Sequence, residues 1–194
     1  MLEEEQYIVS VLALPPNKQL AFALLIFERM LPSLIAFSED ARFDVSSCLQ
    51  AREAAWAWLL NGAVDQGLSQ ACLRSAPDTD EFSRPMTSYA LNAALAMSDI
   101  VEFTQDRRTD HIACVLTLVR DSLHLYLSGL EPSLVSSPEK DRRIAQHPLM
   151  KQEQRREEGD IEFLSGLPGR FDPKTIAVLR QRASDQTSMF PLIP

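Results

Sequence analysis

Glycine is scarce in this sequence. The 194 residues include six glycines, where an average chain of this length carries about 14. Glycine supplies the positive-φ positions of tight turns, bulges and phosphate-binding loops. The scarcity therefore predicts long helices with few tight connections, and it excludes a phosphate loop or a dinucleotide-binding fingerprint. Alternating apolar and polar runs of strand length are absent as well, so no sheet is expected.

Motifs for nucleophilic or metal chemistry are also missing. The three cysteines, Cys48, Cys72 and Cys114, lie far apart in the sequence and form no CxxC pair. Each lies beside apolar residues in a helical pattern, so we predict free thiols packed as small hydrophobic groups. No G-x-S-x-G or H-E-x-x-H motif occurs. We therefore predict no cofactor and no bound metal.

Basic surface is limited, because the chain holds 27 acidic residues against 19 basic ones and has a net charge of −8. The excess of acid lies in residues 1–137, while residues 138–194 are slightly basic. An acidic body repels phosphate backbones, and no basic recognition helix is visible, so no nucleic-acid partner is expected. The N-terminal run Glu3–Glu5 has the wrong sign for a signal peptide, which predicts a cytoplasmic protein.

The most informative feature present is an apolar stretch at residues 20–37, whose only charges are Glu28 and Arg29. A helix that is apolar on every side must be buried on every side. Its two charges then need partners from neighbouring helices, and the candidates are Arg52, Glu53, Asp99 and Arg120. Because the two charges and Pro32 interrupt the stretch, we expect no membrane span. Pro32 should kink or divide the helix.

Helical periodicity continues along the rest of the chain. The expected helices cover residues 2–14, 17–31, 32–41, 44–61, 65–74, 87–105, 109–128, 138–147 and 173–183. The polar run at residues 151–160 should be exposed. The fold prediction is one all-α domain over residues 1–194, a bundle of seven to nine helices around a buried central helix. Residues 1–137 form its acidic body, and the more basic helices of residues 138–194 pack on that body.

Three segments resemble a known family. They are N-x-x-L-A-F-A-L-L-I-F-E-R-M-L-P at residues 17–32, the acidic linker at residues 75–82, and the small-residue helix at residues 90–101. The chain is similar, in this order and over most of its length, to the YjaG-like proteins, a bacterial family described as domain of unknown function 416. The resemblance implies a compact all-helical fold and a cytoplasmic bacterial protein. It implies no activity, so no catalytic residue is carried over.

Two hypotheses of function follow. In the first, the protein is not an enzyme and acts through protein contacts as a homodimer, because Trp58 and the apolar tail at residues 189–194 offer surplus apolar surface. In the second, a small ligand or a metal-dependent reaction occupies a polar pocket inside the bundle. Asp121 and His124 have the i, i+3 spacing that places a carboxylate and an imidazole on one helical face. The candidate ligand-binding residues are Glu28, Arg29, Asp99, Asp121 and His124.

Overall fold

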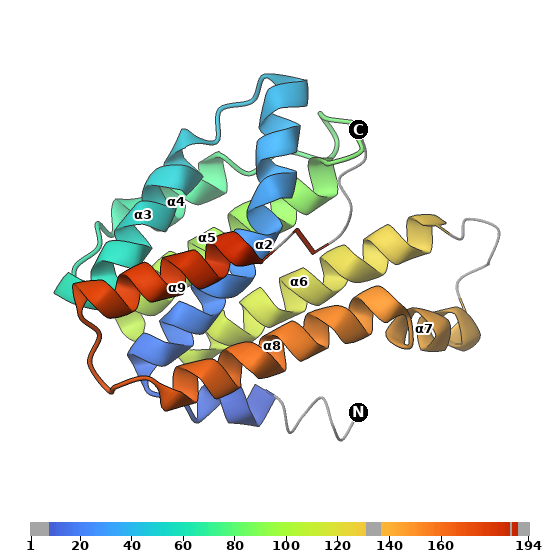
Figure 1. The fold of residues 1–194 in the computed structure, drawn as a ribbon. Helices are drawn as coiled ribbons and strands as arrows, with labels where there is room; N and C mark the ends of the chain where they lie inside the picture. Colours follow the sequence, from blue (N-terminus) through green and yellow to red (C-terminus); the bar gives the residue numbers. More distant parts are fainter. Residues whose placement is uncertain (1–7, 131–136, 187, 190–194) are drawn as a thin grey trace.

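The structure, a computed structural model, describes residues 8–130, 137–186 and 188–189, and within them every regular element is a helix. A helical segment at residues 8–12 precedes eight further helices (Figure 1). The described part of the chain therefore contains nine helices, which confirms the all-α prediction. The eight are α2 (Pro16–Ala41), α3 (Ser46–Asn61), α4 (Gly67–Arg74), α5 (Thr87–Asp106), α6 (Thr109–Leu130), α7 (Pro138–Ala145), α8 (Pro148–Gly166) and α9 (Pro173–Asp185).

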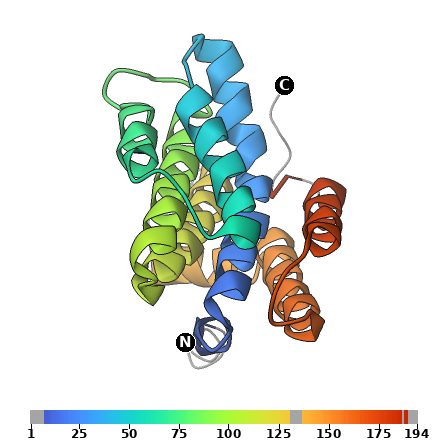
Figure 2. The same cartoon turned by 90° about the vertical axis from the view of Figure 1, so that its left-hand side faces the viewer.

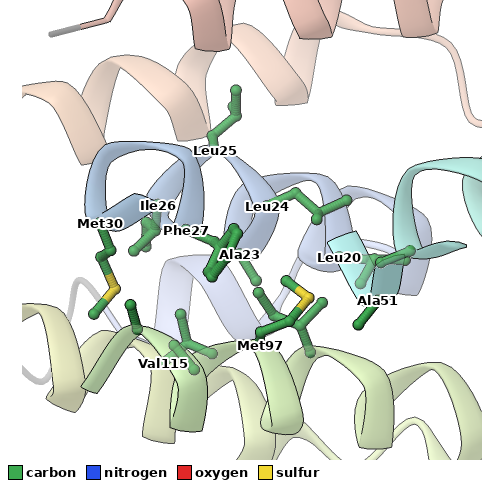
Figure 3. Close-up of a cluster of buried hydrophobic side chains, with 14 of the residues drawn as sticks. Leu20, Ala23, Leu24, Leu25, Ile26, Phe27, Met30, Ala51, Met97 and Val115 are labelled. Carbon is green, nitrogen blue, oxygen red and sulfur yellow. The ribbon is translucent and has the colours of Figure 1, made fainter. Parts of the chain in front are cut away.

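Helix α2 is the buried centre of the bundle, as its sequence predicted. Every side chain from Leu20 to Phe27 is fully buried. In Figure 2, α2 lies between α8 and α9 on one side and α4, α5 and α6 on the other. Figure 3 shows Leu25 directed away from the helices that carry Met97 and Val115. The length and composition of α2 would suit a membrane span, but 72% of its most apolar window is buried in the structure.

Pro32 does not divide α2, which runs without a break from Pro16 to Ala41. Proline lacks the N–H that would bond to the carbonyl of Glu28, and this loss usually kinks or ends a helix. Here the helix continues, because Met30, Ser33, Leu34 and Phe37 on both sides of the proline are buried against other helices. Tertiary packing therefore outweighs the local preference.

The contact between α2 and α5 is the most extensive one in the bundle. Helix α5 presents small side chains to its neighbours, and Ala90, Ala93, Ala94 and Ala96 are all fully buried. Small residues let two helix backbones approach closely, so that the larger side chains of α2 fill the space between them. This row of alanines explains how one helix can be surrounded on all sides.

The C-terminal helices correct one expectation. The polar run at residues 151–160 lies in α8, and Glu153, Glu157 and Asp160 are buried rather than exposed. Helix α8 and helix α9 both pack against α2, with α9 also touching α3. A polar sequence is therefore used as a packing face here, which requires charged partners inside the bundle.

Trp58 corrects a second expectation. Its side chain is only 6% exposed, and the guanidinium of Arg107 lies 4.7 Å from its ring centroid. Met189, at the start of the apolar tail, is also buried, and residues 190–194 lie outside the described part of the chain. Trp58, which was offered as support for a homodimer, is thus covered within the chain. Self-association stays a prediction, which light scattering at micromolar concentration would test.

Candidate functional site

The guanidinium of Arg29 sits at the centre of a buried ionic network between α2, α8 and α9. Its Nε donates to Glu153 Oε1 at 2.6 Å, and its Nη1 donates to Asp160 Oδ2 at 2.8 Å. Arg182 donates from Nε to the other oxygen of Asp160 at 2.7 Å, and Gln186 links Arg29 to Asp160. The Arg29 side chain has no exposed surface.

The carboxylates of this network balance the charge of Arg29, although its Nη2 atom is buried without a hydrogen-bond partner among the described residues. Burial lowers the pKa of Arg29, but the nearby carboxylates of Glu153 and Asp160 outweigh it, and the net shift is upward. The guanidinium therefore stays charged, and buried acids neutralise it. A buried arginine already occupied by two carboxylates has little capacity for an anionic ligand. We interpret Arg29 as a structural group that fastens the C-terminal helices to α2.

Glu28 forms a separate ionic group on the adjoining face of α2. Arg52 of α3 binds it through two bonds, from Nε at 2.7 Å and from Nη2 at 2.9 Å. The indole Nε1 of Trp56 donates to Glu28 Oε1 at 2.8 Å. Arg52 was one of the expected partners, and this expectation is confirmed. These three hydrogen bonds to the carboxylate hold α3 against α2.

A third group of ionisable side chains, which we call the His111 cluster, joins the end of α5 to the start of α6. It consists of Asp99, Glu102, Asp106 and His111. The Nδ1 atom of His111 lies 3.0 Å from Asp99 Oδ1 and 3.8 Å from Glu102 Oε2. The opposite ring nitrogen, Nε2, lies 3.3 Å from Asp106 Oδ2. One imidazole is therefore held between carboxylates on both of its edges.

Helix α4 completes this region. Ser69 is buried, and its hydroxyl donates to Glu102 Oε1 at 2.8 Å and lies 3.0 Å from the hydroxyl of Ser98. A pocket of about 330 Å³ opens beside the cluster. It is lined by Gln66, Ser69, Gln70, Glu102, Gln105 and Asp106. All six lining residues have polar side chains, and two of them belong to the His111 cluster.

The charges of the cluster shift the titration of its members. Burial raises the pKa of Asp99, and the hydrogen bond from His111 offsets only part of this rise. Burial lowers the pKa of His111, but its bonds to Asp99 and Asp106 outweigh burial and raise it above 6.5. A proton on His111 thus favours the folded chain in the absence of a metal.

This shift predicts a pH dependence of stability. Because the pKa of His111 is higher in the folded chain than in the unfolded chain, protonated His111 makes its full contribution to stability below about pH 6.5. This contribution is lost as the pH rises through the folded-state pKa of His111. We expect the free energy of unfolding of the metal-free protein to fall over that window, and His111→Gln to flatten the fall. Urea titrations from about pH 6 to 9 measure it. Equal slopes in the two proteins would contradict the assignment.

The remaining residues singled out from the sequence lie elsewhere. Asp121 is exposed on α6. His124 is exposed too, with its Nε2 atom 3.4 Å from Asp141 of α7. Of the five candidates, only Asp99 belongs to the His111 cluster. His111 was not among the five candidates, although its ring lies between the carboxylates of Asp99 and Asp106.

The cysteines agree with expectation in part, because Cys48 and Cys72 are free and buried. These two cysteines are far apart in the sequence but lie on the neighbouring helices α3 and α4. Cys114 is exposed rather than packed inside. Periodicity assigns a residue to a helix face, but it does not say which faces of two helices meet.

The comparisons with known proteins bear on family and fold. A crystal structure of a DUF416 family protein from Shewanella baltica superposes with a TM-score of 0.81 at 20% identity, covering 92% of this chain and 93% of that one. At this identity the similarity concerns the fold. No curated protein matches the chain.

The family assignment comes from the sequence itself. The model of the family described as "Protein of unknown function (DUF416)" matches residues 7–188. This range contains α2 and its Glu28–Arg29 pair, the acidic linker and the alanine-rich α5, which are the segments that carried the resemblance. It also contains the whole His111 cluster. The chain therefore belongs to the DUF416 family of proteins of unknown function.

Proposed function

We propose that this protein binds a divalent transition-metal ion at Asp99, Glu102 and His111, and that the neighbouring pocket holds a small polar ligand of that metal. The observation that carries the proposal is that one donor atom from each of the three residues lies within 4.8 Å of the other two. The proposal takes up the second hypothesis from the sequence, a ligand or metal site inside the bundle, but it uses only one of the residues named there. It departs from the prediction of no bound metal, which rested on the absence of the usual metal-binding motifs.

The spacing of the donor atoms suits a metal. Two donors that are each about 2.1 Å from a zinc ion lie roughly 3–3.5 Å apart in tetrahedral or octahedral geometry. The distances from His111 Nδ1 to Asp99 and Glu102 are 3.0 and 3.8 Å. Small side-chain rotations would therefore bring the three atoms around one ion. Positions of the ion left open would face water or a ligand, as they do in catalytic sites.

The surrounding hydrogen bonds support the same arrangement. A histidine that binds a metal through one ring nitrogen usually donates its other N–H to a carboxylate, which fixes the orientation of the ring. Asp106 is placed to accept from Nε2 of His111 while Nδ1 faces Asp99 and Glu102. Ser69 orients Glu102 from α4. Asp106 and Ser69 are thus the expected supporting residues.

The donor set narrows the choice of metal. One imidazole with two carboxylates is a donor set that suits zinc, manganese or iron. Calcium and magnesium prefer sites with oxygen donors only. Because the imidazole must lose its proton to bind, we expect metal affinity to increase as pH rises through the pKa of His111.

Titration calorimetry of metal-free protein with Zn²⁺ and with Mn²⁺ tests the proposal. We expect one ion per chain, and a loss of at least about tenfold in affinity in Asp99→Asn and in His111→Gln. The control is His124→Gln, which disrupts an exposed histidine–aspartate pair of similar chemistry and should leave affinity unchanged. No stoichiometric binding by the unaltered protein, or equal losses in the control, would overturn the proposal.

A further inference from the structure

The pocket beside the His111 cluster is bordered by amide groups on two helices. Gln66 immediately precedes α4, Gln70 lies in the first turn of α4, and Gln105 lies in the last turn of α5. All three residues are exposed, so their amide groups are accessible to a molecule in the pocket. An amide group both donates and accepts hydrogen bonds. The pocket can therefore pair with a ligand that does both as well.

The lining disfavours several classes of ligand. Among the six lining residues that the structure describes, none is a lysine, arginine or histidine, so a phosphate or carboxylate group would find no side-chain cation to pair with. None of the six is aromatic or aliphatic, so a flat ring would have no apolar face to stack on. The volume of about 330 Å³ is near the lower end of the range for small-molecule sites, roughly 300–1,000 Å³. It suits a single sugar unit better than a nucleotide or a peptide.

The two carboxylates at the pocket already have partners. Glu102 is a proposed metal ligand, and together with Asp99 it balances the charge of a divalent ion. Asp106 accepts the backbone N–H of Arg108 at 2.8 Å and lies 3.3 Å from Nε2 of His111. Neither carboxylate is thus left for the ammonium group of a ligand to neutralise. The electrostatics of the metal-loaded pocket therefore favour a neutral ligand.

We propose that this pocket binds a small polyhydroxylated molecule, a polyol or a single sugar unit, through two adjacent hydroxyl groups on the metal ion. This inference rests on the metal site proposed above. The three protein donors leave positions of the ion open, and two neighbouring hydroxyl oxygens can occupy them together. The remaining hydroxyl groups, each of which donates and accepts, would pair with the amides of Gln66, Gln70 and Gln105.

Titration calorimetry tests the class of ligand, on protein loaded with Zn²⁺ or Mn²⁺, whichever binds more tightly. Binding is measured rather than melting temperature, because polyols stabilise many proteins by exclusion from their surface. The probes are sorbitol, ribitol and glucose, and we expect saturable binding of at least one of them. We expect no binding of cyclohexanol, which is a ring without adjacent hydroxyl groups, of putrescine as a cation, or of acetate as an anion.

Matched variants assign the binding to the pocket. Gln70→Ala and Gln105→Ala should each weaken binding of the polyol or sugar roughly threefold to tenfold, the effect of losing one hydrogen bond, and leave metal affinity unchanged. The control is Gln50→Ala, an exposed glutamine of α3 outside the pocket, which should change neither affinity.

The outcomes separate the two proposals. Metal binding without binding of any polyol or sugar, or with tighter binding of putrescine or acetate, would overturn this inference and leave the metal site standing. Equal losses in Gln50→Ala, or equal affinity for the polyol in metal-free protein, would also overturn it. Failure of the protein to bind a metal would overturn both proposals.

Discussion

Arg29→Met should destabilise the protein by about 3–5 kcal/mol, the usual cost of removing one partner from a buried ion pair. Methionine has a similar length and fills much of the same volume, so the loss reports charge rather than a large cavity. The variant leaves Glu153 and Asp160 without their shared cation, and the side chain of Asp160 has no exposed surface. Urea unfolding measures the change in free energy.

Two further variants make this expectation specific. Arg52→Met breaks an ion pair in which the arginine side chain is 27% exposed and the Glu28 side chain is 8% exposed. Glu28 keeps its bond from Trp56 in this variant, so we expect a smaller loss than at Arg29, whose side chain has no exposed surface. Arg29→Met combined with Glu153→Gln and Asp160→Asn removes all three charges and should recover part of the stability. A loss in Arg29→Met no greater than in Arg52→Met would contradict the central role of Arg29.

The partners of Arg29 mark the limit of what the sequence predicted. A buried arginine had to find carboxylates, and this requirement was visible in residues 20–37. Its partners were sought in other helices because residues 151–160 are almost wholly polar. Yet Glu153, Glu157, Asp160 and Leu164 recur at helical spacing, and all four are buried. Such a stripe indicates a helix face, and acids on it indicate a buried cation opposite.

The His111 cluster was missed for a different reason. The sequence placed Asp99 and Glu102 on one face of a helix, and His111 near the start of the next. What it did not contain is the geometry of the short connection between α5 and α6, where Arg107 has a left-handed conformation with φ of 60°. That turn brings His111 back over Asp99. Helix identity and burial follow from periodicity, but the meeting of two helix ends depends on the connection between them.

Phe27→Ala should cost about 3–5 kcal/mol, the range measured for removing a buried aromatic side chain. Phe27 is fully buried in the middle of α2, close to the side chains that Figure 3 draws between α2 and its neighbours. Alanine is a better helix former than phenylalanine by a few tenths of a kcal/mol. Any loss of stability therefore reports packing around the helix, because the helix itself is favoured by the change.

The matched control for Phe27→Ala is Leu125→Ala, since Leu125 of α6 is 42% exposed and its truncation should change stability by no more than about 1 kcal/mol. Phe27→Leu should fall between the two, because it keeps most of the buried volume. If Phe27→Ala were as mild as the control, α2 could not be packed on all sides. If Phe27→Ala instead loses about 3–5 kcal/mol of unfolding free energy while its helical circular dichroism at low denaturant is unchanged, the loss comes from packing in the core. In that core, α2 holds the α5–α6 pair to α8 and α9.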